Sequence, residues 1–344
     1  KSQKLFTCGD EGEGGDGDSD GDGAGAGGAG GAGDVVVIVV GFSQFISFKL
    51  ISGINAISKW NPVKPPKARW GPNMQMLRLH NTPAFNYWSE DHEENIWELS
   101  GLFEGDIMLH RAYLRNGLLN EKSTWPDAIV PFYIDSHDFN ETQIMIILKA
   151  FKEYHEKTCV RFRPYEKGDK HWIILKGNYS GCWSSVGRRQ GGQVLNLNTP
   201  KCVRHGVIVH ELLHALGFYH QQSATERDEY VKINWENIIP GHEHNFNKYA
   251  RTHVSNFGVD YDYQSVMHYS SKAFSKNGKN TIDPLDPYAS LGQREGLSQK
   301  DIAKLNEMYE ADCNDFDVFS FNNLSNYLND IIDYFQGTLN NLFR

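Results

Sequence analysis

The chain has 344 residues and carries 34 Lys and Arg against 43 Asp and Glu, a formal net charge of -9 at pH 7. This acidic balance argues against a nucleic-acid partner, which would favour a basic face. The length is sufficient for one or two domains with a sizeable core.

The amino-terminal part differs in composition from the rest of the chain. Residues 1–34 are low in complexity and rich in Gly, Asp and Ala. We predict that they are disordered, because they cannot bury enough apolar area to offset their ordering entropy. Residues 35–51 form an apolar run at the short limit for a membrane span. We interpret this run as a signal or anchor segment, with an ordinary strand as the alternative, and expect membrane association only if it acts as an anchor.

A carboxylate stands out in the mixed stretch of residues 52–115, which we predict to be a propeptide. Asp106 directly follows Gly105, far upstream of the histidine-rich motif described below. In a propeptide, such a carboxylate could occupy the open position of a metal site. The alternative from the residues alone is an ordinary Gly-Asp turn.

A globular pattern begins near residue 125 and continues to about residue 313. Apolar residues at helical spacing predict a helix over 142–158, and short apolar runs predict strands. A less regular stretch follows the histidine motif, and the tail 314–344 has the pattern of an amphipathic helix that packs on its own domain. The predicted strands are 128–134, 172–175 and 193–197, and the other predicted helices are 203–216 and 298–309.

The most informative motif is HELLHALGFYH, which begins at His210. His210 and His214 are four residues apart, so on a helix they share one face and can bind one ion together. Gly217 lets the chain leave the helix, because glycine reaches left-handed backbone angles at little cost, and this bend brings His220 back as a third ligand. Glu211 lies beside the ligands, where it can handle a proton of a water molecule. Three protein ligands with one open position are typical of a catalytic zinc site.

Four of the five cysteines lie around this motif, and an even number there suits two disulfides. No C-x-x-C pair offers a zinc or redox site instead, and Cys8 is left over. Sequons also occur in the chain. Cysteines and sequons together favour a secreted, extracellular and oxidising setting. The four cysteines are Cys159, Cys182, Cys202 and Cys313, and the sequons begin at Asn140, Asn178 and Asn323.

Read together with Ser-Val-Met-His-Tyr at residues 265–269, the histidine motif resembles the astacin family of zinc metalloproteases, a branch of the metzincins. Segments 157–162, 180–188 and 227–231 agree with that family, and the resemblance covers roughly residues 116–313. It implies an α+β catalytic domain of two subdomains, with a mixed sheet, a zinc helix at the cleft and a methionine turn.

The resemblance also implies roles for individual residues. The three histidines would ligate one zinc ion, and Glu211 would act as general base and later as general acid. Tyr269 would be a fifth zinc ligand that stabilises the oxyanion, and Met267 would form the turn beneath the metal. In the zymogen, Asp106 would bind the zinc and keep the enzyme latent.

Activation and disulfide pairing follow from the same resemblance. Arg115-Asn116 is similar to the usual activation cleavage, which would make Asn116 the new amino terminus. One of the three pairings open to the four cysteines is the family's: Cys159 with Cys313, and Cys182 with Cys202.

Three positions depart from the family pattern. The family usually has a glutamate directly after the third histidine, where it contacts the buried mature amino terminus, and this chain has Gln221 there. The usual arginine and aspartate a few residues further on are Ala224 and Glu226. These changes leave the predicted zinc ligands intact but alter their surroundings.

We therefore predict a secreted zinc endopeptidase that cleaves proteins or peptides, is made as a zymogen and needs an activating protease. One alternative is a matrixin-like or reprolysin-like metzincin. Those enzymes lack Tyr269 after the methionine turn, and the matrixins use a propeptide cysteine that residues 52–115 do not contain. The other alternative is a catalytically silent zinc-fold binding protein, against which the presence of Glu211 and all three histidines argues.

Overall fold

The structure is a computed structural model that describes residues 63–66, 83–109, 123–252 and 254–314, together with residues 326, 329, 332 and 333. All of these residues lie in one compact unit, Gly53–Arg344. The predictions for residues 1–51, for the cleavage at Arg115 and for most of the tail after residue 313 fall outside the described residues.

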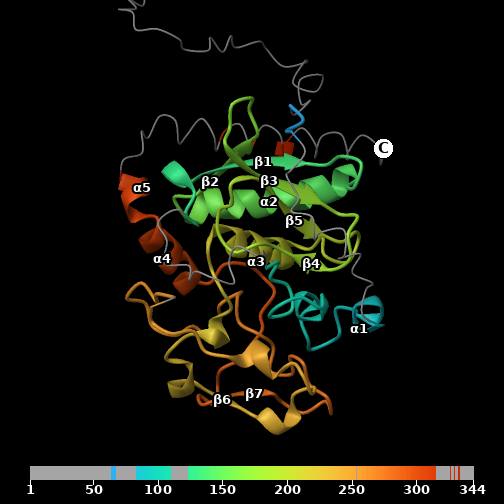
Figure 1. Cartoon of the computed structure of the whole chain (residues 1–344), viewed down its shortest axis with the longest axis vertical. Coiled ribbons are helices and arrows are strands. Elements are labelled where there is room, and N and C mark those ends of the chain that lie inside the picture. The colour runs from blue at the N-terminus through green and yellow to red at the C-terminus, as the bar shows by residue number, and fades with distance from the viewer. Residues whose placement is uncertain are drawn as a thin grey trace, which may run out of the picture. The chain divides into compact units, whose positions relative to one another are not determined.

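A five-stranded sheet with the order β2-β1-β3-β5-β4 forms one end of this unit (Figure 1). Four strands run parallel, and the edge strand β4 is antiparallel to β5. The sheet is therefore mixed, as predicted. The strands are β1 (Ile129–Ile134), β2 (Arg161–Pro164), β3 (His171–Lys176), β4 (Cys182–Trp183) and β5 (Gly191–Leu197).

Helix α2 (Glu141–Lys157) packs its apolar side on the sheet. It begins with a capping box, in which Asn140 Oδ1 accepts from the Gln143 N–H at 3.0 Å and the Asn140 N–H donates to Gln143 Oε1 at 2.9 Å. The ring centroid of Phe151 lies 4.5 Å from that of Phe132 on β1 and 4.5 Å from that of Phe162 on β2. These aromatic contacts fix the helix over neighbouring strands.

Helix α3 (His205–Leu216) runs beside α2 and is buried along almost its whole length (Figure 1). A helix that is apolar on all sides belongs in a core, and the metal motif of this chain lies on such a helix. The hydroxyl of Tyr154 on α2 donates to the carbonyl of Val209 at 2.7 Å, which links the two helices. The histidines of α3 are thereby held inside the protein.

The stretch between α3 and residue 298 forms the other end of the unit and has less regular structure, as predicted (Figure 1). It contains the antiparallel pair β6 (Val231–Ile233) and β7 (Ile282–Pro284). The chain then continues through α4 (Gln299–Met308) and α5 (Glu310–Asn314). Short 3-10 helices lie at Ile96–Leu99, Pro126–Ala128, Gln221–Ser223, Arg227–Glu229, Trp235–Asn237 and Glu243–Phe246.

Residues 83–109, the larger described part of the predicted propeptide, pack into the same hydrophobic core as α3. This segment begins with the short helix α1 (Pro83–Tyr87). Phe85, Trp88, Ile96 and Trp97 are each at most 5% exposed, so they bury apolar area against the rest of the unit. The segment is therefore an integral part of the folded chain.

The regular elements predicted between residues 125 and 313 are all confirmed, with ends that differ by a few residues. The structure adds β2, β4, β6, β7 and the short helices. Both implied disulfides are present: Cys159–Cys313 joins the end of α2 to α5, and Cys182–Cys202 joins β4 to the loop before α3.

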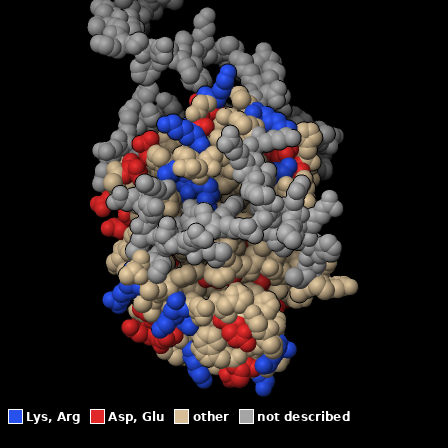
Figure 2. Space-filling model, viewed as in Figure 1, with Lys and Arg blue, Asp and Glu red and all other residues tan. Residues whose placement is uncertain are grey.

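Among the described residues, no helix combines the length and the apolar character needed to cross a membrane. Lys and Arg side chains are interspersed with Asp and Glu on the face shown in Figure 2. Interspersed charges of this kind produce no large field of one sign on that face.

The buried His155 predicts how stability depends on pH. Its Nε2 accepts from the Phe162 N–H at 2.7 Å, and burial together with the nearby Arg161 charge lowers the pKa of His155 to about 3. In the unfolded chain the imidazole has its ordinary pKa of about 6.5. Because only the unfolded chain then binds a proton, the free energy of unfolding falls as pH drops from about 6.5 to about 3, by up to about 1.4 kcal/mol per pH unit.

His155→Gln keeps an acceptor for the Phe162 N–H but cannot titrate, so its stability should fall less steeply in acid. Urea unfolding midpoints at a series of pH values would measure this difference. His137→Gln serves as the control, because the His137 side chain is 83% exposed. Identical slopes for His155→Gln and the parent chain would contradict the assignment.

Candidate active site

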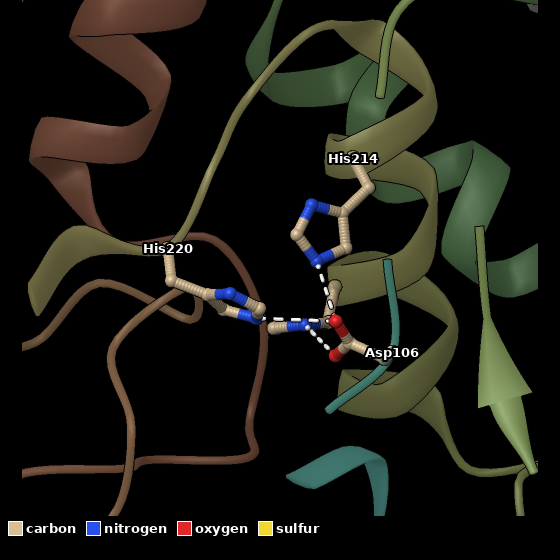
Figure 3. Close-up of side chains that lie close together, drawn as sticks. Asp106, His214 and His220 are labelled. Carbon is tan, nitrogen blue, oxygen red and sulfur yellow. Dashed lines mark hydrogen bonds and ion pairs between the residues drawn. The ribbon is translucent and has the colours of Figure 1, made fainter. Parts of the chain in front are cut away.

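Four side chains that could together hold a metal ion meet in the core: His210, His214, His220 and Asp106. Each is at most 2% exposed, and their ligand atoms all lie within 4.8 Å of one another. Asp106 Oδ2 is 3.0 Å from His210 Nε2, and Asp106 Oδ1 is 3.2 Å from His214 Nε2 and 3.4 Å from His220 Nε2 (Figure 3). The sequence therefore identified a group of residues that the fold brings together.

Gly217 ends α3 in the way that the sequence predicts. Its φ of 123° is rare for residues with a side chain, and its N–H donates to the His214 carbonyl at 2.9 Å. The Phe218 N–H donates to the Leu213 carbonyl at 3.1 Å. The chain then turns back, so that His220 faces the two histidines of the helix (Figure 3).

Each histidine ring is oriented by an acceptor at its Nδ1 atom. His210 Nδ1 lies 2.8 Å from the Val266 carbonyl, and His214 Nδ1 lies 2.7 Å from the Phe218 carbonyl. His220 Nδ1 lies 2.9 Å from a carboxylate oxygen of Glu104. Because these oxygens only accept, we assign a proton to Nδ1 in each ring, and each Nε2 faces Asp106. A metal ion would displace any proton on Nε2, since imidazoles protonated at Nδ1 bind metals through Nε2.

The chemistry of the cluster fits a divalent cation. His214 Nε2, His220 Nε2 and Asp106 Oδ1 are buried and have no hydrogen-bond partner among the described residues. Unsatisfied buried polar atoms are costly, and a cation between them would satisfy all three. Burial lowers the pKa of His220, but the Asp106 and Glu104 carboxylates outweigh it and raise that pKa to about 9. The site therefore favours positive charge, and its nitrogen and oxygen donors are ligands that zinc accepts.

Glu211 has the properties of a proton-transfer group beside this cluster. It is fully buried on α3, and neither carboxylate oxygen has a hydrogen-bond partner among the described residues. Burial, and secondly the negative charge of Asp106, raise the pKa of Glu211 well above its usual range. A carboxyl group with a raised pKa can both accept and return a proton near neutral pH.

Tyr269 and Met267 lie on the turn that passes under the cluster. Both are at most 2% exposed, and the Tyr269 ring centroid is 4.8 Å from that of His220. The Tyr269 hydroxyl donates to the Glu104 carbonyl at 2.8 Å. The Met267 carbonyl accepts from the Gln221 N–H at 2.9 Å, which joins the turn to the residue after His220. In this state the tyrosine hydroxyl is engaged by residues 83–109.

Sequence analysis missed Glu104, which makes contacts in several directions. Its carboxylate contacts His220 and also accepts from the Tyr249 hydroxyl at 2.5 Å. Its carbonyl accepts from the Tyr269 hydroxyl, and its N–H donates to Asn245 Oδ1 at 3.0 Å. The next residue must be glycine, because Gly105 has a φ of 91° and a Cβ there would lie 2.9 Å from the Glu98 Cα. Glu104 lies only two residues before Asp106 in the sequence, but no role was predicted for it.

Sequence analysis also missed Trp97 and Glu98. The Trp97 ring stacks on His210, with 4.2 Å between the ring centroids. The buried Glu98 carboxylate accepts from the N–H and the hydroxyl of Ser270, at 2.7 and 2.8 Å. Residues 83–109 therefore contact the cluster and the tyrosine turn at several points besides Asp106, and no local pattern in the sequence signals these long-range contacts.

The three departures from the family pattern surround one cavity of about 560 Å³ beside His220. Gln221 Oε1 accepts from the Lys304 ammonium at 2.7 Å, and both side chains are at most 8% exposed. Ala224 and Glu226 line the same cavity. The amide of Gln221 thus provides a neutral acceptor for a buried cation, and burial lowers the pKa of Lys304.

Comparison with known proteins gives matches over the same region. The family model described as Astacin, a peptidase family, matches residues 118–310. Zinc metalloproteinase nas-14 of Caenorhabditis elegans is 47% identical over 188 residues, which cover 54% of this chain and 37% of that protein. Human meprin A subunit beta is 45% identical over 213 residues, which cover 61% of this chain and 30% of that protein.

Among solved structures, the chain is similar to high choriolytic enzyme 1, a hatching enzyme zinc-protease from the medaka fish Oryzias latipes. The TM-score is 0.50 with 36% sequence identity, and the match covers 60% of this chain and 99% of that one. The match spans only about a third of the length of nas-14 and of meprin A subunit beta, which are both longer than this chain.

The chain forms a mixed α/β unit that buries three histidines and a glutamate around a site for one metal ion. This arrangement is typical of the metzincin class of zinc peptidases. Within that class, the chain belongs to the astacin peptidase family. The predictions of the family, of its fold and of one zinc ion as its cofactor are confirmed at this level.

The buried Glu98 gives a prediction about residues 83–109. Glu98→Ala leaves both donors of Ser270 unpaired in the core, so we expect a loss of about 1–3 kcal/mol of stability. The loosened segment should also be cut faster in limited proteolysis, which mass spectrometry of the fragments would locate. Asp91→Ala is the control, because Asp91 is an exposed carboxylate of the same segment. Equal cleavage rates in the two variants would rule out Glu98 as an anchor.

Proposed function

We propose that the chain is a secreted zinc endopeptidase, made as a zymogen that Asp106 keeps latent and that cleavage near Arg115-Asn116 activates. The observation that carries this proposal is the convergence of three imidazole Nε2 atoms on one buried carboxylate. The names of the relatives, zinc metalloproteinase and hatching enzyme zinc-protease, support the same activity for this chain. Its substrates are proteins or peptides.

In the proposed active form, His210, His214 and His220 would hold the zinc ion after Asp106 has left the cluster. Bound zinc supplies Lewis-acid chemistry, since it polarises a carbonyl group and makes water a stronger acid. The Val266 and Phe218 carbonyls keep His210 and His214 in the metal-binding tautomer.

Glu211 is proposed as the general base and then the general acid. It accepts a proton as water attacks the scissile carbonyl and returns that proton to the departing amine. Its burial excludes competing hydrogen-bond donors from the carboxylate. Proton transfer of this kind contributes roughly 10²–10⁴-fold to the rate.

Tyr269 is proposed as the oxyanion donor and as a fifth ligand of the zinc. In the latent chain its hydroxyl is bound to the Glu104 carbonyl. Removal of residues 83–109 would free that hydroxyl to donate to the negative oxygen of the tetrahedral transition state. A preorganised donor of this kind is worth about 2.7–4 kcal/mol. Met267 supports the turn from which Tyr269 projects.

The zymogen proposal predicts a difference between the intact and the cleaved chain. Intact protein should leave a quenched protein substrate uncut, because Asp106 occupies the metal centre and residues 83–109 cover it. Protein cleaved between Arg115 and Asn116 and then separated from the amino-terminal fragment should be active and should lose its activity with a zinc chelator. Equal activity of the intact protein and of the separated form would argue against the latency role of Asp106.

Glu211→Gln separates the enzyme from a zinc-fold binding protein. In the cleaved chain it should lower kcat by about 10²–10⁴-fold, because the amide cannot take up the proton. Zinc content measured by mass spectrometry should stay at one ion per chain, since Glu211 is not among the proposed ligands. Unchanged effects of the protein on its targets would favour the binding-protein alternative.

A further inference from the structure

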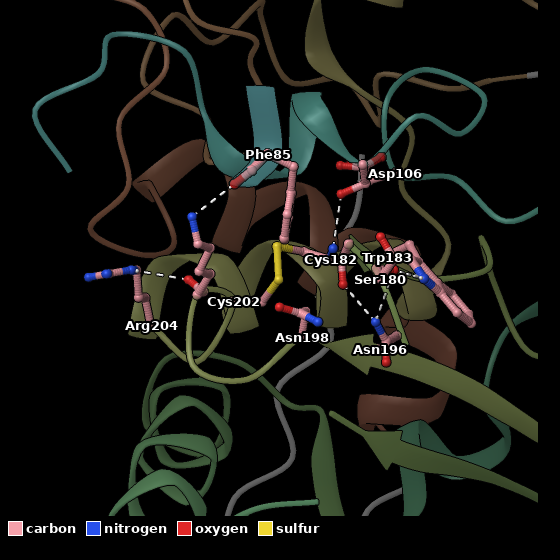
Figure 4. Close-up of a disulfide and its surroundings, with 12 residues drawn as sticks. Phe85, Asp106, Ser180, Cys182, Trp183, Asn196, Asn198, Cys202 and Arg204 are labelled. Atoms are coloured by element: carbon pink, nitrogen blue, oxygen red, sulfur yellow. Dashed lines mark hydrogen bonds between the residues drawn. A yellow bond between two sulfur atoms is a disulfide. The ribbon is translucent and has the colours of Figure 1, made fainter. Parts of the chain in front are cut away.

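Residues 83–94 contact four cationic side chains from later parts of the chain, which we call the basic patch: Lys201, Arg204, Lys272 and Arg294. They come from separate parts of the chain. Two precede α3, one follows Tyr269 and one precedes α4. All four are partly buried in the presence of the segment. Figure 4 shows that Arg204 of the patch and Phe85 of the segment 83–94 both lie close to the Cys182–Cys202 disulfide.

The indole of Trp88 is the centre of the contact. The guanidinium carbon of Arg204 is 5.4 Å from the Trp88 ring centroid, and that of Arg294 is 5.7 Å from it. Trp88 is only 5% exposed, and its Nε1 donates to the Glu94 carbonyl at 2.8 Å, which fixes the ring. Both guanidinium groups are therefore attracted to the same aromatic ring through its quadrupole.

Acidic residues of the segment complement the patch. The sequence from residue 90 to residue 94 contains four carboxylates. Glu90 forms an ion pair with Arg204, and Glu93 forms one with Lys272 at 2.6 Å. Exposed pairs contribute little one by one, but several charges together form a network whose strength depends on salt.

Backbone groups of the segment complete the contact. The Lys201 ammonium donates to the carbonyls of Phe85 and Trp88, at 3.0 and 3.2 Å, and also to that of Asn86. The Arg294 guanidinium donates to the His92 carbonyl at 2.7 Å. These donors bind carbonyls at the end of α1 and in the turns that follow it, and the carbonyls they bind lie well before Asp106 in the sequence.

The two arginines of the patch carry like charges that repel each other, and the segment reduces this repulsion. Burial, and secondly the charge of Arg294, lower the pKa of Arg204. Trp88 and Glu90 lie against this repelling pair and offset its charge. The interaction is thus complementary in shape and in charge, and it does not involve the metal cluster.

We propose that the basic patch is a second anchor for residues 83–94, so that the propeptide stays bound as a noncovalent inhibitor after the chain is cut at Arg115-Asn116. Activation then needs two events: cleavage, and a salt-dependent dissociation of the fragment. This inference rests on the proposed zymogen function. It adds a regulatory step that Asp106 alone does not provide.

The test uses the full chain with Glu211→Gln, which prevents self-digestion, and with a site-specific protease sequence placed between Arg115 and Asn116. After cutting, size-exclusion chromatography follows whether the amino-terminal fragment co-elutes with the rest of the chain. Dissociation is timed by dilution into excess unlabelled peptide of residues 83–109. Neither readout requires proteolytic activity, so failure of the proposed function leaves this test intact.

We expect the fragment to co-elute at low salt and to dissociate about tenfold faster at about 0.5 M salt, where the Debye length is under about 5 Å. Arg204→Glu with Arg294→Glu should speed dissociation about 30-fold, since both cation–π contacts and one ion pair are lost. The matched control is Lys149→Glu with Lys167→Glu, two charge reversals at exposed positions. This control should dissociate at the parent rate.

A second variant changes the fragment and leaves the basic patch intact, so the proposal can still be tested if the arginine variant does not fold. Trp88→Ala with Glu90→Lys and Glu93→Lys alters only the fragment and should give the same acceleration. Asp106→Ala should still co-elute at low salt. The proposal is overturned if the parent fragment leaves at once after cutting, or if both sets of patch variants dissociate at the parent rate.

Discussion

The structure depends on one constraint: three imidazoles can be buried together only if every Nδ1 has an acceptor and every Nε2 shares a positive centre. Water cannot repair a missing partner there, because all the rings are inaccessible to solvent. Two of the acceptors are the Val266 and Phe218 carbonyls, which lie outside residues 83–109. The third is the Glu104 carboxylate, which belongs to the segment proposed to leave. His220 is therefore the proposed ligand that would lose its Nδ1 acceptor on activation.

The same constraint explains how far the sequence could be interpreted. Spacing on one helix face and a glycine that permits a bend are local properties, so His210, His214 and His220 were predictable without any fold. Trp97 and Glu98 were not, because their partners His210 and Ser270 lie more than a hundred residues away and nothing in either local pattern announces the contact. Short elements such as β4 and β6, with two and three residues, are likewise fixed by tertiary pairing and carry no periodicity of their own.

Gln221 shows how a substitution beside the cluster can be accommodated. A glutamate at this position would face the Lys304 ammonium as an ion pair, whereas the amide offers only an oxygen dipole. Lys304 keeps its charge balance through Asp301 and Asp262, which raise its pKa against the effect of burial. The neutral residue is thus tolerated because carboxylates on neighbouring elements already supply the negative charge.

A single carboxylate on a metal is a weak basis for lasting latency, since a ligand that dissociates and rebinds competes with water at every opening. The Asp106 carboxylate stays in place because the rest of the segment holds it at a high effective concentration beside the metal centre. Trp88 between two arginines, Trp97 on His210 and Glu98 on Ser270 restrict residues 83–106 at three places before Asp106 is reached. Cleavage after residue 109 leaves each of these contacts intact, so breaking the covalent link changes the effective concentration far less than removing the segment does. In the proposed zymogen, latency would therefore be a property of the whole docked segment, with Asp106 as the point at which that docking acts on the metal centre.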